Sequence, residues 1–495
     1  MALDSPSDAG GTEPSAITPV PLHNEPPLCV DLDGTLVRTD LLFEMALSYV
    51  RQKPSGVLDL MAWTLRGKAR LKTELAARVR LDAATLPYNP ELLAELRSQK
   101  SAGRKILLVT ASPMAAARGV ASHVGLFDDV LATEEGVNLS GSTKRDRLVG
   151  LFGPAGFDYV GNAWADIKIW RASREAWLAD PYLGVAFAAR RVANVTAVFN
   201  KRPPLWRTLP RVLRVHQWIK NLLIFVPLLT SHRFVEYWLS MRAAVGFLAF
   251  SLCASAIYVF NDLLDLQHDR AHPRKRTRAM AIGNFPINQA VPLVPVLLML
   301  SAFISSVLPW EFFRALIVYA VMSLLYSWWL KRHELLDVLV LAGLWTIRLF
   351  AGSAATGIEP SFWFLSFSMF IFMSLALAKR CSELITVRER RSGPRAHGRD
   401  YRIDDLAVLA AMGGGCGCVA VLVFALYVYN PQSRLLYRDR EALLMICPLL
   451  LYWISRVWLK TWRGEMSEDP VVFAVTDRAS RWIAVAAALI LLYAK

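Results

Sequence analysis

The 495-residue sequence is poor in cysteine and histidine, and this scarcity excludes small folds held by disulfides or zinc. Its six cysteines stand at positions 29, 253, 381, 416, 418 and 447, and none forms the paired CxxC spacing of a zinc site. We interpret all six as packing residues and predict no disulfide framework. The first 27 residues also lack the basic start and apolar stretch of a secretory signal. Because they are rich in Pro, Ser, Gly and acids, we predict a disordered leader over 1–27.

Acidic residues are also in short supply, with 41 Asp and Glu against 56 Lys and Arg, so the formal net charge is +15. Apolar residues make up 54% of the chain and the mean hydropathy is +0.33, which is too high for a purely soluble protein. In a membrane protein an excess of cations indicates cytoplasmic loops and anionic lipid before nucleic acid. We therefore predict a membrane protein and no nucleic-acid partner.

Nine apolar segments in the last two thirds are long enough to be candidate membrane spans. They lie at roughly 217–231, 243–262, 288–308, 312–330, 336–355, 361–380, 406–429, 441–459 and 479–494. Loops after even-numbered spans carry twenty Lys and Arg, against six after odd-numbered spans. The positive-inside rule then places the N-terminal part and the even-numbered loops in the cytoplasm, and we predict a multi-pass protein of the cell membrane.

The first third is different, since it begins with a buried strand that runs into a tight turn at Leu28-Cys-Val-Asp31-Leu-Asp33-Gly34-Thr. Helical patterns follow over about 40–100 and would form a cap. A second apolar strand covers 105–112, and 158–166 is predicted to be a third strand and loop with an acid, Asp166, at its end. Asp31 and Asp33 are two residues apart in extended chain and share a face, and Gly34 lets the backbone approach a phosphate.

This pattern resembles the haloacid dehalogenase superfamily of phosphatases, and DxDGT is a specific motif. The resemblance implies a Rossmann-like α/β domain over 28–199 with a helical cap, and then a linker over 200–210. It also implies that Asp31 is the nucleophile and Asp33 the acid/base, that Thr110 and Lys144 hold the phosphoryl oxygens, and that Mg²⁺ is bound by Asp31, Asp33 and Asp166.

One position departs from this family, because Gly161 is followed by Asn162 where the family usually has aspartate. An amide binds Mg²⁺ more weakly than a carboxylate does. The alternative to a phosphatase is therefore a degenerate regulatory domain without catalysis.

A second motif, Asn261-Asp-Leu-Leu-Asp-Leu-Gln-His-Asp269, follows a long apolar segment and precedes the basic run 270–278. On a helix, Asp262, Asp265 and Asp269 would share one face. Three carboxylates at the end of a membrane helix are costly unless a cation binds there, and partial carboxylate ligation suits Mg²⁺. The basic run, with Lys275 and Arg276, would hold the phosphates of an anionic substrate. The alternative is a solvated acidic turn with a positive-inside flank.

This motif resembles the UbiA superfamily of intramembrane prenyltransferases, which implies an all-α transmembrane bundle of about nine helices over 211–495. Most members carry a second aspartate-rich motif after the sixth helix, but here the sequence is Ala378-Lys379-Arg380-Cys-Ser-Glu383. Lysine and arginine in that place suit direct pairing with phosphate oxygens.

Together with Gln217-Trp-Ile-Lys220-Asn221, these segments resemble the decaprenyl-phosphate phosphoribosyltransferases of actinobacterial cell-wall synthesis. The resemblance implies transfer of 5-phosphoribose from phosphoribosyl pyrophosphate to a polyprenyl phosphate. We predict the metal at Asp262, Asp265 and Asp269, which also form the catalytic set. The predicted substrate-binding residues of this domain are Lys220, Asn261, Lys275, Arg276, Tyr326, Lys331, Arg348, Lys379, Arg380 and Glu383.

The roles of Tyr326, Lys331 and Arg348 need further comment. Tyr326 and Lys331 fit an interface anchor with positive-inside bases about as well as a polar cavity. Arg348 lies in the middle of a span, and we expect it to contact phosphate or a carboxylate partner.

Three functions stay open on the sequence. The first is a fusion enzyme in which the phosphatase-like domain removes a phosphate from the lipid-linked product. The second is a prenyltransferase that attaches a prenyl diphosphate chain to an aromatic acceptor. The third is a non-catalytic membrane scaffold with an inactive phosphatase-like sensor. Association of the chain into homo-oligomers is also open.

Overall fold

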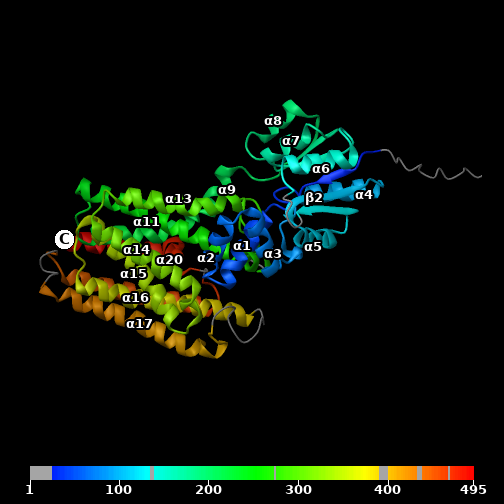
Figure 1. Cartoon of the computed structure of the whole chain (residues 1–495). Coiled ribbons are helices and arrows are strands. Elements are labelled where there is room, and N and C mark those ends of the chain that lie inside the picture. The colour runs from blue at the N-terminus through cyan, green and yellow to red at the C-terminus, as the bar shows by residue number, and fades with distance from the viewer. Residues whose placement is uncertain (1–24, 134–138, 273–274, 390–399, 432–436, 467–468) are drawn as a thin grey trace, which may run out of the picture. The chain divides into compact units, whose positions relative to one another are not determined.

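The computed structural model describes residues 25–133, 139–272, 275–389, 400–431, 437–466 and 469–495 (Figure 1). It divides into two compact units. The first comprises Met1–Pro203 with Ala281–Pro286, and the second comprises Pro204–Met280 with Ile287–Lys495.

The described part of the first unit is built on a six-stranded sheet in the order β3-β2-β1-β4-β5-β6. The strands are β1 (Leu28–Val30), β2 (Ile106–Pro113), β3 (Asp129–Thr133), β4 (Asp158–Gly161), β5 (Ala176–Ala179) and β6 (Val195–Phe199). All neighbouring pairs are parallel, and Leu28 on β1 is in register with Ile106 on β2 and Asp158 on β4. A parallel sheet brings the carboxyl ends of its strands to one edge, where sites of open α/β folds form.

Helices cover both faces of this sheet, as Figure 1 shows. Alternate residues of β1 point to opposite faces, so Leu28 and Val30 pack with α4 (Pro90–Ser101) and α5 (Met114–Val124). Cys29 packs on the other face with α6 (Ser142–Phe152), α7 (Ile167–Trp170) and α8 (Val185–Val192). The sequence-based prediction of an α/β fold with a parallel sheet is confirmed.

Three helices between β1 and α4 pack on one another: α1 (Leu41–Gln52), α2 (Gly56–Leu65) and α3 (Lys68–Arg78). Their shared core contains Met45, Tyr49, Leu75 and Val79. Asp40 caps α1 by accepting hydrogen bonds from the first-turn amides of Leu42 and Phe43. We call α1–α3 the cap.

The second unit is helical, and within its described residues seven helices are long and apolar enough to cross a membrane. They are α11 (Tyr237–Leu264), α13 (Ile287–Ser305), α14 (Trp310–Trp328), α15 (Leu336–Thr356), α16 (Phe362–Glu389), the span Ile403–Val428 containing α17 (Leu406–Val428), and the span Glu441–Trp462 containing α19 (Ile446–Trp462). An eighth span results if the bent pair Leu205–Val212 and Val215–Thr230 counts as one. The ninth predicted segment forms α21 (Arg478–Ala494), which has 17 residues. The helical membrane fold is thus as predicted.

Helix α15 joins the two largest cores of this unit. One core is shared with α11 and α14, and the other with α16, α17 and α19. On α15, Gly352 allows a close approach, because a Cβ there would lie 2.1 Å from the carbonyl oxygen of Ile224 in η3 (Val215–Phe225). The six cysteines, all in described residues, are free. Cys418 is exposed on α17, so its interpretation as a packing residue is wrong.

Two helices near the predicted site differ in length from the expected spans. Helix α16 continues to Glu389, nine residues beyond the predicted end at 380, since a helix need not end at the membrane surface. The acidic segment is not one continuous helix, because α11 ends at Leu264 and α12 (Leu266–Ala271) starts after Asp265. Asp265 caps both helices with φ −91° and ψ 5°.

Candidate functional site

The first candidate site lies at the carboxyl edge of the parallel sheet. Asp31 and Asp33 follow β1, Thr110 lies in β2, and Asp166 follows β4. Since β2 and β4 are the two neighbours of β1, these side chains come together although they are far apart in sequence.

A chain of polar contacts connects the acids of this site. Lys144, from α6, contacts Asp31 with an Nζ–Oδ1 distance of 2.6 Å and donates to the hydroxyl of Tyr159 at 3.0 Å. The Tyr159 hydroxyl in turn donates to Asp166 at 3.2 Å. Burial raises the pKa of Tyr159 well above its usual value, as do Asp166 and Asp31, so its hydroxyl stays a proton donor. Burial alone would lower the pKa of Lys144, but Asp31 and Asp166 raise it, so the lysine stays charged.

Asp33 is held by three donors, one from α1 and two from β2. It accepts hydrogen bonds from the Leu41 amide at 2.8 Å, from the Thr110 hydroxyl at 3.3 Å and from the Ser112 hydroxyl at 2.6 Å. Burial, with the neighbouring carboxylate of Asp40, raises the pKa of Asp33 to about 7. Asp33 therefore has the proton affinity that a general acid needs near neutral pH.

The donor set of this edge fits a divalent cation. Burial, with Asp31, raises the pKa of Asp166 to about 6, as expected where carboxylates crowd together. The Asn162 side chain lies directly over the turn, because a Cβ on Gly34 (φ +77°) would lie 2.3 Å from Asn162 Nδ2. That nitrogen is buried and has no hydrogen-bond partner among the described residues. Asp31, Asp33, Asp166 and the Asn162 amide supply the oxygen ligands that Mg²⁺ prefers.

Tyr159 positions two charged groups of this site, and its replacement by phenylalanine tests that role. We expect Tyr159→Phe to lower kcat for phosphate-ester hydrolysis about 10-fold with little change in KM, since Lys144 and Asp166 lose a shared partner. Steady-state kinetics on the full chain measure this. Tyr88→Phe is the matched control, because the Tyr88 hydroxyl donates to a backbone carbonyl, that of Ala83, at 2.9 Å. An unchanged kcat would show that the hydroxyl does not position the pair.

The second candidate site lies in the helical unit, where Asp262 and Asp269 converge on one guanidinium group. Arg278 lies 2.9 Å from Asp262 and 2.5 Å from Asp269, and both carboxylates are buried. Arg214 also pairs with Asp262. Two carboxylates that meet at one cation supply oxygen donors of the kind that Mg²⁺ prefers. Asp265, half-buried at the helix break, lies between them in sequence.

Arg214 has φ +51°, which is uncommon for a residue with a side chain. Such backbone strain persists where the surroundings fix the residue, and here its side chain is fixed by Asp262. Across the described residues, no group of three or more His, Cys, Asp or Glu side chains is already arranged to hold a metal ion. In both sites a basic side chain lies between the acids: Lys144 in the first and Arg278 in the second.

A cluster of basic residues forms at the same end of the helices. Lys220 of η3 pairs with Asp469, and Lys379 of α16 lies 3.6 Å from the same carboxylate. Asp469 also caps α20 (Pro470–Thr476), accepting from the amide of Val471 at 3.1 Å. Asp469 thus draws two lysines from distant parts of the chain together.

Arg380 is the most deeply buried cation of this cluster, with 1% of its surface exposed. It forms ion pairs with Asp337 at 2.6 Å and with Glu383 at 2.8 Å. It also donates to the Tyr326 hydroxyl at 2.7 Å. Asp337 also accepts a hydrogen bond from the Tyr401 hydroxyl at 2.5 Å. Arg380 therefore ties α16 to the ends of α14 and α15.

The acidic and basic groups are linked by neighbouring residues on α14. Asn261 donates to the Ser327 hydroxyl at 2.9 Å, and the adjacent Tyr326 contacts Arg380. Of the other predicted residues, Lys275 lies 4.0 Å from Asp269, Arg276 is exposed, and Lys331 is half-buried. The helical unit thus presents carboxylates beside cations, as a site for a diphosphate and a phosphate requires.

Arg348 is buried in α15 and contacts neutral groups. It donates to the Asn221 side chain at 2.8 Å, to the Tyr319 hydroxyl at 3.3 Å and to the Leu344 carbonyl. The expected carboxylate is thus replaced by neutral acceptors in the described contacts. Contact with a phosphate stays a prediction.

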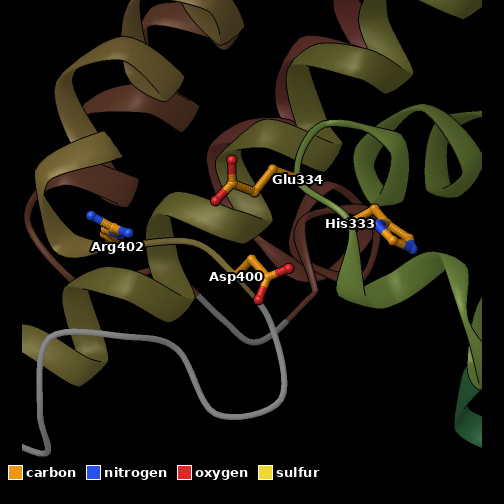
Figure 2. A pocket seen from close by; sticks show the side chains of 4 residues that line it. All are labelled: His333, Glu334, Asp400 and Arg402. Atoms are coloured by element: carbon orange, nitrogen blue, oxygen red, sulfur yellow. The ribbon is translucent and has the colours of Figure 1, made fainter.

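An open hollow of about 480 Å³ lies next to the Arg380 contacts (Figure 2). It is lined by His333, Glu334, Asp400 and Arg402, which differ from the predicted site residues. In the view of Figure 2 the Glu334 and Asp400 side chains lie between those of Arg402 and His333. Because it adjoins Tyr401, which ties Leu335 and Asp337 together, we regard it as a neighbour of the site and not as its substrate cavity.

Removal of the Arg380 side chain is expected to be strongly destabilising. Arg380→Ala leaves the fully buried Asp337 without its ion pair, which we expect to cost about 3–5 kcal/mol of unfolding free energy. Thermal unfolding of purified protein in detergent measures the loss. In the control, Arg314→Ala, the exposed pair with Glu311 is removed, so a change of about 0–1 kcal/mol is expected. Equal stability of the two variants would contradict the structural role of Arg380.

Several residues that form contacts in both sites lie outside the predicted site residues: Ser112, Tyr159, Arg214, Asp337, Tyr401 and Asp469. Arg278 belongs to the basic run 270–278, which was predicted to hold phosphates. A signal existed for Asp469, because an acid directly before a proline is a helix start. Ser112 ends the same predicted strand as Thr110. No local signal marks Arg214 or Tyr159, since their partners are distant in sequence.

The fold and both sites define a multi-pass membrane protein with an α/β unit of hydrolase type. The chain belongs to the UbiA prenyltransferase family, whose family model matches residues 221–484. Residues 28–168 match the model of haloacid dehalogenase-like hydrolases. Both resemblances found in the sequence are therefore confirmed.

The similar proteins cover different shares of this chain. The uncharacterized protein y4nM of Sinorhizobium fredii is 36% identical over 463 residues, which is 92% of this chain and 89% of that protein. Nodulation protein NoeC of Azorhizobium caulinodans is 34% identical over 270 residues, covering 54% of this chain and 86% of NoeC. Decaprenyl-phosphate phosphoribosyltransferase of Mycolicibacterium smegmatis is 37% identical over 178 residues, covering 35% of this chain and 56% of that enzyme.

Among solved structures, a UbiA homolog from Archaeoglobus fulgidus bound to GPP and Mg²⁺ is 15% identical, with a TM-score of 0.44. The match covers 58% of this chain and 98% of that chain.

Proposed function

We propose that the helical unit transfers 5-phosphoribose from phosphoribosyl pyrophosphate to a polyprenyl phosphate, and that the α/β unit then removes the 5-phosphate from the lipid-linked product. We further propose that this takes place at the cytoplasmic face of the cell membrane. The corresponding domains are 28–199 and 211–495. Of the predicted linker 200–210, residues 205–210 belong to helix α9 (Leu205–Val212), so 200–204 connect the last strand to this helix.

The observation that carries this proposal is the position of Lys379 and Arg380. Where a second acidic motif would bind further Mg²⁺, α16 instead carries the cations Lys379 and Arg380. Lys379 and Lys220 share the carboxylate of Asp469, and Arg380 pairs with Asp337. A cationic cluster suits a lipid monophosphate, which can pair with it directly. The similarity to decaprenyl-phosphate phosphoribosyltransferase supports the same substrates, over a part of each chain.

In the transfer step, the bond between ribose C1 and the pyrophosphate oxygen breaks, and a bond from C1 to a lipid phosphate oxygen forms. Pyrophosphate leaves with the electron pair, so negative charge grows on the leaving group. Bound Mg²⁺ would neutralise that charge beside Asp262 and Asp269. Lys220, Lys379 and Arg380 would hold the acceptor phosphate in line with C1.

In the hydrolysis step, the Asp31 carboxylate attacks the phosphorus of the 5-phosphate and the bond to the ribose O5 breaks. Asp33 gives its proton to the leaving oxygen, and then takes one from the water that hydrolyses the aspartyl phosphate. Lys144, which pairs with Asp31, and Thr110, which donates to Asp33, would hold the phosphoryl oxygens, and Tyr159 would keep Lys144 oriented. The net products are the dephosphorylated lipid and inorganic phosphate.

The full chain, purified and reconstituted with polyprenyl phosphate, Mg²⁺ and ribose-labelled phosphoribosyl pyrophosphate, tests both steps. We expect label in the organic phase, release of pyrophosphate, and then release of inorganic phosphate. Chelation of the metal should stop all three. Failure of label to enter the lipid would refute the transferase, whereas lipid labelling without phosphate release would refute only the hydrolase.

The same preparation, given a prenyl diphosphate and aromatic acceptors, tests the alternative prenyltransferase. The family assignment alone allows that activity. We expect no prenylated product, because Lys379 and Arg380 stand where most members of the family carry a second acidic motif. A prenylated aromatic product would overturn the phosphoribosyl proposal.

A further inference from the structure

Helix α2 of the cap exposes a continuous apolar face. Its large exposed side chains are Val57, Leu58, Met61 and Leu65, with Leu58 69% and Leu65 88% exposed. At 100° per residue, these four positions lie within about 100° of one another around the helix. Apolar residues gathered on one face, in contrast to scattered ones, indicate an interaction surface.

The opposite side of α2 already packs against the cap. Gly56 lies against Tyr49, with its added Cβ 2.7 Å from the ring, and Leu60 and Trp63 join the core of α1 and α3. The single charged residue within α2, Asp59, contacts Tyr49 and Lys53 and is therefore away from the apolar face. The four exposed side chains thus belong to a face without charge.

Basic side chains lie at both ends of this face. Lys53 precedes α2, while Arg66 and Lys68 follow it, and all three are exposed. Apolar residues flanked by lysine and arginine are the pattern of helices that lie in a membrane interface, where anionic headgroups surround the acyl boundary. Binding of a second protein chain would not require cations at both ends of this apolar face.

The connection between the α/β unit and the first candidate membrane span is short, so the bilayer is within reach of this unit. Strand β6 ends at Phe199 and α9 (Leu205–Val212), the first part of the bent candidate span, begins at Leu205. Five intervening residues extend to at most about 18 Å, which is less than the diameter of a domain of this size. A tethered apolar face meets the bilayer at high effective concentration.

We propose that the apolar face of α2 inserts into the interface of the anionic cytoplasmic leaflet and docks the cap on the membrane. Val57, Leu58, Met61 and Leu65 enter the acyl boundary, and the flanking cations contact lipid phosphates. This is a surface additional to both candidate sites.

Docking would also serve the hydrolase site, and this consequence rests on the proposed function. Lys72 of α3, the helix that packs on α2, donates to the Ala111 carbonyl at 2.7 Å, between Thr110 and Ser112. The cap therefore contacts the edge of the sheet where Asp33 lies. A cap held in the interface would bring this edge to the headgroup of a phosphorylated lipid.

Fluorescence quenching on the full chain in nanodiscs with anionic lipid tests the docking. A bimane label is placed at Leu65→Cys in a Cys418→Ser background, and lipids with a shallow nitroxide act as quenchers. A label at Ser98→Cys, an exposed position of α4, is the matched control. We expect at least twofold quenching at position 65 and none at position 98.

The variant Leu58→Asp with Met61→Asp should reduce quenching at position 65 to the control level. Its thermal unfolding should be unchanged, which shows that the cap is intact. A label that iodide in water quenches while lipid nitroxides do not would overturn the proposal. So would a label shielded from both quenchers, because a protein surface would then cover α2.

Assays of phosphate hydrolysis distinguish a failure of the docking proposal from a failure of the proposed function. If both hold, the double variant keeps hydrolysis of a small soluble phosphate ester and loses at least fivefold on the lipid-linked product. If lipid quenching is present and neither substrate is hydrolysed, the hydrolase proposal fails and the docking stands.

Discussion

Replacing Asp262 and Asp269 together by asparagine should abolish label transfer to the lipid, with a loss of at least about 10²–10³-fold. Asparagine keeps the size of each side chain but removes the negative charge that the converging carboxylates supply. In the structure both acids contact Arg278, so their shared feature is the charge they present to one cation. Transfer rates at saturating Mg²⁺ on the reconstituted chain measure the effect.

Two controls make this prediction specific. Glu311→Gln removes an exposed acid at the start of α14, so transfer should be unchanged. Hydrolysis of a soluble phosphate ester by the double variant should also be unchanged, since Asp262 and Asp269 lie in the other unit. Transfer at a rate close to that of the parent chain would show that these carboxylates do not serve the reaction.

The second large effect is expected for Asp31→Asn, which should lower phosphate-ester hydrolysis by about 10³-fold or more. An amide at this position keeps the shape of the side chain but is a poor nucleophile. It also takes away the ion pair of the buried Lys144, whose Nζ lies 2.6 Å from Asp31. Reconstituted Asp31→Asn should therefore accumulate the phosphorylated lipid product, which mass spectrometry detects.

Asp146→Asn provides the comparison for this variant. Asp146 is an exposed acid of α6, paired with Arg145, and lies two residues after Lys144. Hydrolysis should not change in this control. If Asp31→Asn retained hydrolysis, Asp31 would not be the nucleophile, and the degenerate-domain interpretation of Asn162 would gain support.

The hydrolase-like site was largely predictable because its residues follow short, buried strands. The DxDGT turn, the strand 105–112 with Thr110, and the Gly161-Asn162 loop each have a local signature. A parallel sheet brings the carboxyl ends of its strands, and with them these residues, to one edge. Tyr159 was not predictable as a site residue, because the apolar pattern of its strand, β4, predicts only that the side chain is buried. Its bond to Lys144 depends on how α6 packs against the sheet.

The helical unit was predictable in its spans and less so in its contacts. Hydropathy places nine apolar segments, but it does not show that α11 breaks at Asp265 or that α16 continues past Arg380. Pairs such as Lys220 with Asp469 join residues at opposite ends of the unit's sequence, and only tertiary packing brings them together. Side-chain partners at such separations leave no periodic pattern in the chain.

Arg278 has a consequence for how the helical site takes up an ion. Because its guanidinium contacts both Asp262 and Asp269, it serves as an internal counter-ion that keeps these buried acids neutralised. On the proposed function, a divalent ion bound by Asp262 and Asp269 would displace this arginine, and its apparent affinity would equal the intrinsic affinity reduced by the cost of that exchange. The displaced guanidinium would then be available to the diphosphate of the donor, so ion and donor should assist each other's entry.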